Sequence, residues 1–354
     1  MQSDPKQQVT QIWESLLGVS PIAPDQNYFD LGGDSILAVQ MFAQIEKVFQ
    51  VKLPVATLFE APTIGDLVEV LSREAPKLQW SSLVAIQPKG SRPPLFCVHP
   101  HGGNVLLYGE LSKHLGDDQP FYGLQSRGLD GSCPPLTRIE DMAAHYISEI
   151  KSIQPVGPYY LSGYCMGGLV AYEIAQQLSE RGERIGVLAL IDTLNWAGNL
   201  PPSLWEDMVH TFERALFHLS NFLSIRAPEK SAFVREKWKS LETRVPIWWR
   251  RALDQLLRHR ESETSEPSVL AQIWKANLRA CMDYYPRPYS DLLIDIKPAR
   301  QYRCFSRAEL AWDRLAKDGQ RVIILPVNAP AIMVEPFVRH LAEALRNLLQ
   351  GNEQ

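Results

Sequence analysis

The chain has 354 residues, of which 45% are apolar and 21% charged, and its net charge is −4. These values are ordinary for a globular protein with room for more than one domain, and no basic stripe points to nucleic-acid binding. No apolar run is long enough for a membrane span, and the N-terminus lacks the apolar core of a signal peptide, which favours the cytoplasm. Five cysteines without CxxC spacing argue against a disulfide framework or a zinc site.

Residues 1–75 predict a small bundle of three main helices. Apolar residues recur at helical spacing over 6–17, again from Ser35 onward, and over 62–71. This segment carries ten acidic and four basic side chains, whereas the rest of the chain is faintly basic. We interpret the contrast as a small acidic unit that is delivered electrostatically to several partners, with chance composition as the alternative. Residues 76–83 are expected to form a linker.

Residues 84–354 predict a second domain in which strands and helices alternate. Strands are expected at 93–100, 119–125, 159–164 and 185–192, with helices between them. This alternation predicts a mostly parallel sheet with helices on both faces. The strands stop from about 197 to 285, where amphipathic helices rich in Trp and Arg indicate a lid inserted over the active site. Strands are expected again at 301–308 and 321–327, before a final helix.

A serine stands at the start of the second predicted helix, in the stretch LGGDSILAVQ. Gly32 and Gly33 let the backbone turn sharply, and a helix N-terminus favours an attached phosphate through its free N–H groups and its dipole. Ser35 is therefore a candidate attachment point for a phosphate group. The alternative is that Ser35 only begins the helix and that Asp34 is its N-cap.

The stretch LSGYCMGGLV, residues 161–170, has the pattern Gly-x-nucleophile-x-Gly between an apolar run and a helix. Gly163, Gly167 and Gly168 supply the small residues that so tight a strand-to-helix turn requires. Cys165 occupies the nucleophile position, and the dipole of the following helix is expected to favour its thiolate. A buried structural cysteine in a Gly-containing turn is the alternative.

Asp192 closes the next apolar strand, 27 residues after Cys165. A carboxylate at the carboxyl edge of a parallel sheet suits the acid that orients the base of a catalytic triad. Its alternative role is to cap the loop or to pair with a nearby arginine. The pattern therefore favours Asp192 as the second member of a triad.

Together these motifs resemble two known families. Residues 6–74, with LGGDS, resemble a peptidyl carrier domain of a nonribosomal peptide synthetase. Residues 84–350, with PLFCVHPHGGN, YYLSGYCMGGLVAYEIA and VLALIDT, resemble a type I thioesterase domain. The resemblance implies a small all-α carrier helix bundle followed by an α/β-hydrolase domain with a helical lid insertion.

The resemblance also implies a cofactor, an oxyanion hole and partners. The cofactor is 4′-phosphopantetheine, bound covalently to Ser35. The oxyanion hole comes from the backbone N–H groups of Met166 and His101, so that the His101 imidazole need not be catalytic. The implied partners are upstream condensation and adenylation domains and a phosphopantetheinyl transferase. The carrier is expected to dock on the thioesterase in cis. Neither nucleic acid nor a membrane is an expected partner.

One expected residue departs from the thioesterase pattern. The family's general-base histidine lies in a stretch like PGxHxxLxxEP before the final helix, and this stretch reads LPVNAPAIMVEP here. Aligning Pro326 and the Glu335–Pro336 pair places Ala329 at the histidine position, where alanine cannot take or return a proton. No spacing assigns a substitute among the later and lid histidines His340, His210, His218 and His259. Whether this alanine and the nucleophilic cysteine are natural or engineered stays open.

The sequence thus predicts a carrier–thioesterase unit that moves an acyl or peptidyl chain from Ser35 to Cys165. Release is expected by hydrolysis or by cyclisation to a lactone, a β-lactone or a lactam. We expect release to be impaired, because the incoming nucleophile finds no base at Ala329, whereas a cysteine can accept the chain with little help from a base. The alternatives are a catalytically dead thioesterase domain that only docks the carrier, and a free-standing esterase, which the carrier disfavours.

Overall fold

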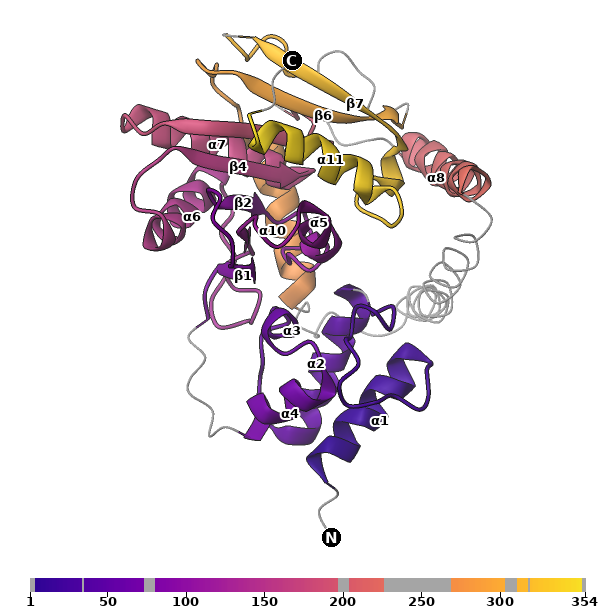
Figure 1. The fold of residues 1–354 in the computed structure, drawn as a ribbon. Helices are drawn as coiled ribbons and strands as arrows, with labels where there is room; N and C mark the ends of the chain where they lie inside the picture. Colours follow the sequence, from indigo (N-terminus) through magenta and orange to yellow (C-terminus); the bar gives the residue numbers. More distant parts are fainter. Residues whose placement is uncertain are drawn as a thin grey trace, which may run out of the picture.

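The computed structural model describes residues 4–33, 35–72, 80–196, 204–225, 269–302, 311–317 and 319–351. Helices α1 to α4 form an N-terminal unit, and a sheet with helices packed on it makes up the rest of the described chain (Figure 1). Within these ranges, no helix is both long and apolar enough to cross a bilayer.

The N-terminal unit is a small helical bundle, as predicted. Its helices are α1 (Pro5–Leu17), α2 (Ser35–Phe49), α3 (Thr57–Glu60) and α4 (Ile64–Ser72). The Asp4 carboxylate caps α1 by accepting the Lys6 N–H, and Gly18 ends the helix with a φ of 63°. Trp13 is fully buried and meets Tyr28 edge to face, with 5.3 Å between the ring centroids.

The sheet has the strand order β1-β3-β2-β4-β5-β6-β7. The strands are β1 (Leu83–Gln87), β2 (Leu95–Val98), β3 (Phe121–Leu124), β4 (Tyr159–Tyr164), β5 (Ile185–Ile191), β6 (Leu293–Arg300) and β7 (Gln320–Asn328). β1 pairs antiparallel with β3, and the other neighbouring pairs are parallel. The predicted mostly parallel sheet is confirmed.

Alternate residues of β2 divide the sheet between two hydrophobic cores. Phe96 and Val98 belong to the core that α6 (Ile139–Ile153) and α7 (Met166–Glu180) cover. Leu95 and Cys97 belong to the opposite core, which α5 (Tyr108–Leu115) and α11 (Val338–Leu349) cover. Side chains alternate between the two faces of a strand, so each face carries its own helical layer.

Two strands differ from the sequence prediction. β1 begins at Leu83, where the linker 76–83 was expected to end, and half of that linker, residues 76–79, lies outside the described residues. The strand β6, Leu293–Arg300, was not predicted, and most of the strand expected at 301–308 lies outside the described residues. The buried apolar side chains that make β6 a strand precede Arg300 and are Leu293, Ile294 and Ile296.

The predicted lid contains α8 (Leu204–Ser224) and α10 (Val269–Asp283). Both lie within the expected range of about 197 to 285. The helices expected between them, over 226–268, lie outside the described residues.

Candidate active site

The turn between β4 and α7 holds Cys165 at the carboxyl edge of the sheet. Cys165 has a φ of 56° and a ψ of −120°, a conformation that is strained for a residue with a side chain. Its N–H donates to the Ile191 carbonyl at 2.9 Å, which ties the turn to β5. A strained residue at a strand-to-helix turn is the geometry of a nucleophile elbow.

Three glycines permit this turn. A Cβ on Gly163 would lie 2.2 Å from the Gly167 backbone, and one on Gly167 would lie 2.2 Å from the Val98 carbonyl oxygen. A Cβ on Gly168 would lie 2.0 Å from Oγ1 of Thr193. The predicted need for small residues around Cys165 therefore has a steric cause at each glycine.

The Cys165 thiol is neutral. Burial, followed by the nearby charge of Asp192, raises the pKa of the thiol to about 12, and the Met166 N–H lowers it less. The helix N-terminus favours the thiolate as expected, through the Met166 N–H, but the expected net lowering of the pKa was wrong, because loss of water costs the charged sulfur more.

The turn after β2 places the His101 side chain against Cys165. Sγ of Cys165 lies 3.6 Å from Nδ1 of His101, and the Trp274 ring lies 5.3 Å from the imidazole between centroids. Burial lowers the pKa of His101 to about 4, so the imidazole is neutral near pH 7 and one ring nitrogen can accept a proton. Sequence reasoning gave His101 only a backbone role. The signal it missed is that His101 follows a strand next to the elbow strand.

Asp192 lies beside Cys165 at the carboxyl edge, because Tyr164 of β4 pairs with Ile191 of β5. Burial raises the pKa of the Asp192 carboxyl to about 6, and Gln301 Nε2 donates a hydrogen bond to its Oδ1. The structure thus brings the predicted nucleophile and the predicted acid together. The hydrogen-bond partner seen on the carboxylate is a glutamine, where a triad needs a histidine.

Ala329 begins a short 3-10 helix, Ala329–Ala331, that follows β7. It is 2% exposed, and the neighbouring Asn328 donates from Nδ2 to Oδ1 of Asn221 at 2.7 Å. β7 is three places from β4 in the sheet. The buried methyl group of Ala329 therefore occupies the position predicted for the histidine.

Ser35 is the first residue of α2. Gly32 has a φ of 82°, and a Cβ on Gly33 would lie 2.3 Å from the Tyr28 ring. The chain therefore turns at these two glycines, and Ser35 lies at a helix N-terminus, whose free N–H groups favour a phosphate. The residues before Ser35 fit an attached phosphopantetheine.

Comparison with known families decides what the two domains are. Residues 7–71 match the phosphopantetheine attachment site family, and residues 93–228 match the thioesterase domain family. The chain is a carrier domain followed by a thioesterase domain. The cofactor of such a carrier domain is covalently attached 4′-phosphopantetheine.

The curated relatives of this carrier–thioesterase chain are peptide synthetases. It is 42% identical over 191 residues to malpinin synthetase of Mortierella alpina and 39% identical over 181 residues to a dimodular nonribosomal peptide synthase of Bacillus subtilis (strain 168). Each match covers 51% of this chain, but only 2% and 8% of the respective relative's length.

Solved structures agree with this assignment. The four-domain nonribosomal peptide synthetase holo-AB3403, bound to AMP and glycine, matches 97% of this chain and 26% of its own, at a TM-score of 0.58 and 26% identity. The NocB thioesterase domain, in covalent complex with a fluorophosphonate nocardicin G analogue, has a TM-score of 0.52 and 20% identity. That match covers 75% of this chain and 99% of the NocB chain, and it supports the fold.

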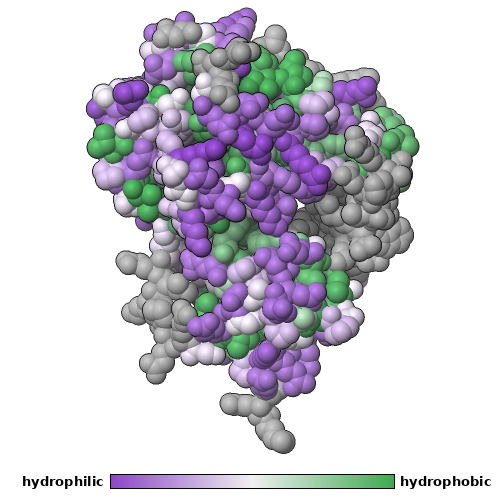
Figure 2. Space-filling model, viewed as in Figure 1, coloured by the Kyte–Doolittle hydropathy of each residue, from purple (hydrophilic) through white to green (hydrophobic). Residues whose placement is uncertain are grey.

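The carrier domain contacts the thioesterase domain close to the turn that follows β2. Leu106 of the thioesterase domain packs within the core cluster of the carrier, and Lys113 Nζ lies 3.2 Å from an oxygen of Asp30. A cavity of about 220 Å³ between the domains is lined by Phe42 of the carrier and Val269 of α10, among others. The face seen in Figure 2 is mostly hydrophilic, with hydrophobic side chains in separate patches.

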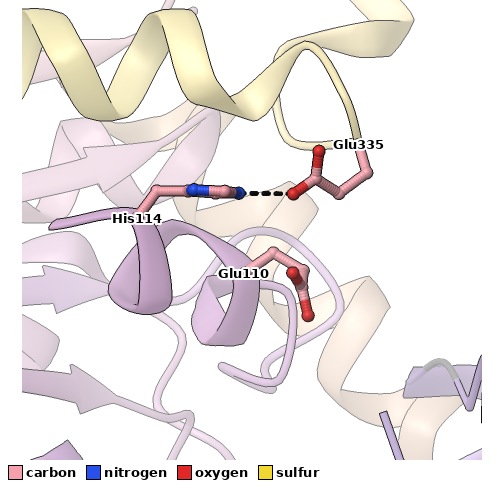
Figure 3. Close-up of side chains that lie close together, drawn as sticks. All are labelled: Glu110, His114 and Glu335. Carbon is pink, nitrogen blue, oxygen red and sulfur yellow. Dashed lines mark hydrogen bonds and ion pairs between the residues drawn. The ribbon is translucent and has the colours of Figure 1, made fainter. Parts of the chain in front are cut away.

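A cluster of ionisable side chains joins α5 to the loop before α11. Glu110, His114 and Glu335 place their ligand-type atoms within 4.8 Å of one another, and His114 points at Glu335 (Figure 3). Lys113 also binds Glu110 at 2.9 Å, and Arg339 binds Glu335 at 3.1 Å. Both carboxylates are thus paired with cations, so we interpret the cluster as an ion-pair network that holds α11 on α5.

Proposed function

We propose that this chain releases an acyl or peptidyl chain in a nonribosomal peptide synthetase, with Cys165 as nucleophile and the His101 imidazole as general base. The observation that carries the proposal is the 3.6 Å contact between Cys165 Sγ and His101 Nδ1 on a nucleophile elbow. Phosphopantetheine on Ser35 would supply the terminal thiol to which the chain is attached as a thioester. Upstream synthetase domains and a phosphopantetheinyl transferase are the corresponding partners.

The first step moves the chain onto the enzyme. The Cys165 thiol gives its proton to Nδ1 of His101, and the sulfur attacks the acyl carbonyl carbon. The bond from that carbon to the carrier's pantetheine sulfur then breaks, and this sulfur would leave with the proton from His101, so that the imidazole is neutral again. The Met166 N–H, at the first position of α7, faces the sulfur and donates to the developing oxyanion. Nδ1 of the neutral imidazole has a lone pair that can take this proton.

The second step frees the chain from Cys165. Water, or a hydroxyl or amine of the chain itself, loses its proton to Nδ1 of His101 and attacks the acyl carbon, and the Cys165 sulfur leaves and takes up a proton. The products are an acid, a lactone or a lactam. A thioester on Cys165 keeps more activation than an oxygen ester, which favours attack by an amine or closure of a strained ring such as a β-lactone.

With His101 as base, the alanine at 329 does not by itself block release. The Asp192 carboxylate accepts a hydrogen bond from Gln301, so it does not orient His101. Asp192 would then act on Cys165 through its negative charge alone. A catalytically dead thioesterase domain that only docks the carrier is the competing function. The buried methyl group of Ala329 favours it, since the family's base is missing there.

The test is intact-mass analysis of the chain after an acyl-pantetheine is loaded on Ser35. We expect turnover with transient acyl-Cys165, and a His101→Gln variant is expected to slow turnover by roughly 10²–10⁴-fold, as loss of a general base does. His340→Gln, on the exposed part of α11, is the control. Equal turnover in His101→Gln contradicts the proposed base, and absence of any acyl-Cys165 supports the docking module.

A further inference from the structure

The lid helix α10 contacts His101 with three side chains of one face. The Trp274 ring lies 5.3 Å from the imidazole between centroids and is tilted by 44° to it. Asn277 Nδ2 donates to the His101 carbonyl oxygen at 2.9 Å, and Cys281 Sγ lies 3.7 Å from Nε2. Residues at this spacing share a face of a helix, so a single helix controls both the ring and the backbone of His101.

The two ring nitrogens of His101 face two different thiols. Nδ1 faces Cys165 and Nε2 faces Cys281. A neutral imidazole carries one N–H and one lone pair. Nδ1 can take the Cys165 proton only in the tautomer that has its hydrogen on Nε2, and that hydrogen then points at the sulfur of Cys281.

Cys281 is suited to accept this hydrogen. It is 2% exposed, so water does not compete for the Nε2–H. Burial raises the pKa of the Cys281 thiol, which therefore stays uncharged and accepts through its sulfur lone pairs. Cys165 acts on Cys281, and His99 and His101 act on each other, and burial lowers the pKa of His99 so that it too is neutral near pH 7. The charge of Asp192 acts on Cys165.

We propose that Cys281 is a positioning residue that accepts the Nε2–H of His101 and so holds the tautomer whose Nδ1 receives the Cys165 proton. Asn277 supports the same arrangement by fixing the His101 carbonyl. This inference rests on the proposed role of His101 as the base. An uncharged thiol thus stands where a catalytic triad has a carboxylate.

The helix α10 also connects His101 to the surface of the carrier domain. α10 runs from beside the sheet toward the carrier helices (Figure 1), and its first residues, Val269 and Leu270, line the cavity between the domains. A shift of α10 at the carrier end would therefore move the three side chains that hold His101.

The test compares Cys281→Ala with the conservative Cys281→Ser in the full chain. ¹⁵N chemical shifts of labelled histidine rings report the tautomer, and His101→Gln identifies the His101 signals. The rate of Cys165 alkylation by iodoacetamide, followed by peptide mass spectrometry from pH 6 to 9, reports proton removal from the thiol. Cys133→Ala, a partly exposed cysteine away from these contacts, is the control for thiol number.

We expect the Nε2–H tautomer in the wild-type chain and in Cys281→Ser, and a mixture of tautomers in Cys281→Ala. Alkylation near pH 7 should fall about fivefold in Cys281→Ala, which is the effect of one lost hydrogen bond, and should change less than about twofold in Cys281→Ser. A wild-type Nδ1–H tautomer, or equal tautomer populations in all three proteins, overturns the inference. If His101→Gln turns over normally while the tautomer follows Cys281, the base assignment fails and the positioning contact stands.

Discussion

Sγ of Cys165 lies 3.6 Å from Nδ1 of His101, although 63 residues separate them in the chain. The contact arises because β2 and β4 are adjacent parallel strands, with Val98 paired to Gly163. The turns that follow the two strands therefore meet at one sheet edge. Ala329 follows β7, which lies three strands from β4 on one side. His101 follows β2, which is the neighbour of β4 on the other side, so its imidazole reaches Cys165 from the side opposite to Ala329.

The elbow glycines are open to a direct steric test. Gly163→Ala would bring a methyl group to 2.2 Å from the Gly167 backbone, which cannot yield without moving the turn. We expect a loss of about 1–3 kcal/mol or more in the free energy of unfolding, measured by urea titration, together with loss of acyl transfer to Cys165. Gly102→Ala is the control, since its nearest neighbour atom would lie at 3.7 Å. Equal stability of both variants would contradict the close packing.

The buried carboxyl of Asp192 predicts a pH-dependent stability. Its pKa is raised to about 6 by burial, above the unfolded value of about 3.9. The folded state therefore binds this proton more tightly, and ionisation destabilises the folded state as pH rises through about 4 to 6. Asp192→Asn should raise the free energy of unfolding by about 3 kcal/mol at pH 8 and change it little at pH 4.

Asp118→Asn is the control for this charge effect. Hydrogen bonds from Ser91 and the charge of Arg92 lower the pKa of the Asp118 carboxyl, so removing its charge should not stabilise the chain at pH 8. A stability gain in both variants would point to a general effect of net charge.

Ala329→His tests the base position expected from the family. Ala329 is 2% exposed, so a histidine ring must displace its neighbours, and we expect a loss of about 1–3 kcal/mol in the free energy of unfolding. Asn347→His, on the exposed side of α11, controls for adding a histidine. We expect no gain in turnover for Ala329→His. A clear gain would restore the sequence-based assignment and count against His101.

The effect of the contact between the two domains on acyl transfer can be measured separately from the chemical step at Cys165. Leu106→Asp places a charge among the apolar side chains of the carrier core cluster, and it should slow transfer from the loaded carrier. Transfer from a free acyl-pantetheine thioester to Cys165 should change little. Lys113→Ala removes an exposed ion pair to Asp30, worth about 0–1 kcal/mol, and should change transfer less than about fivefold. Equal slowing with both substrates would place the effect in the active site.

The amino-acid sequence by itself determined the architecture and the positions of Cys165 and Asp192 at one edge of the sheet. Alternating apolar runs and amphipathic helices specify the parallel sheet, and the glycines around Cys165 specify the elbow, because both depend on local periodicity and local sterics. Asp192 could be placed beside Cys165 because consecutive parallel strands end at the same sheet edge.

Only the tertiary structure decided the protonation and the neighbours of Cys165. Burial makes the Cys165 thiol neutral, which the dipole argument from the sequence did not include. His101 and Cys281, which lie 180 residues apart, come into contact only when α10 packs over the turn after β2. Such contacts depend on how distant elements are packed, and desolvation depends on what surrounds a group, so neither can be read from local sequence.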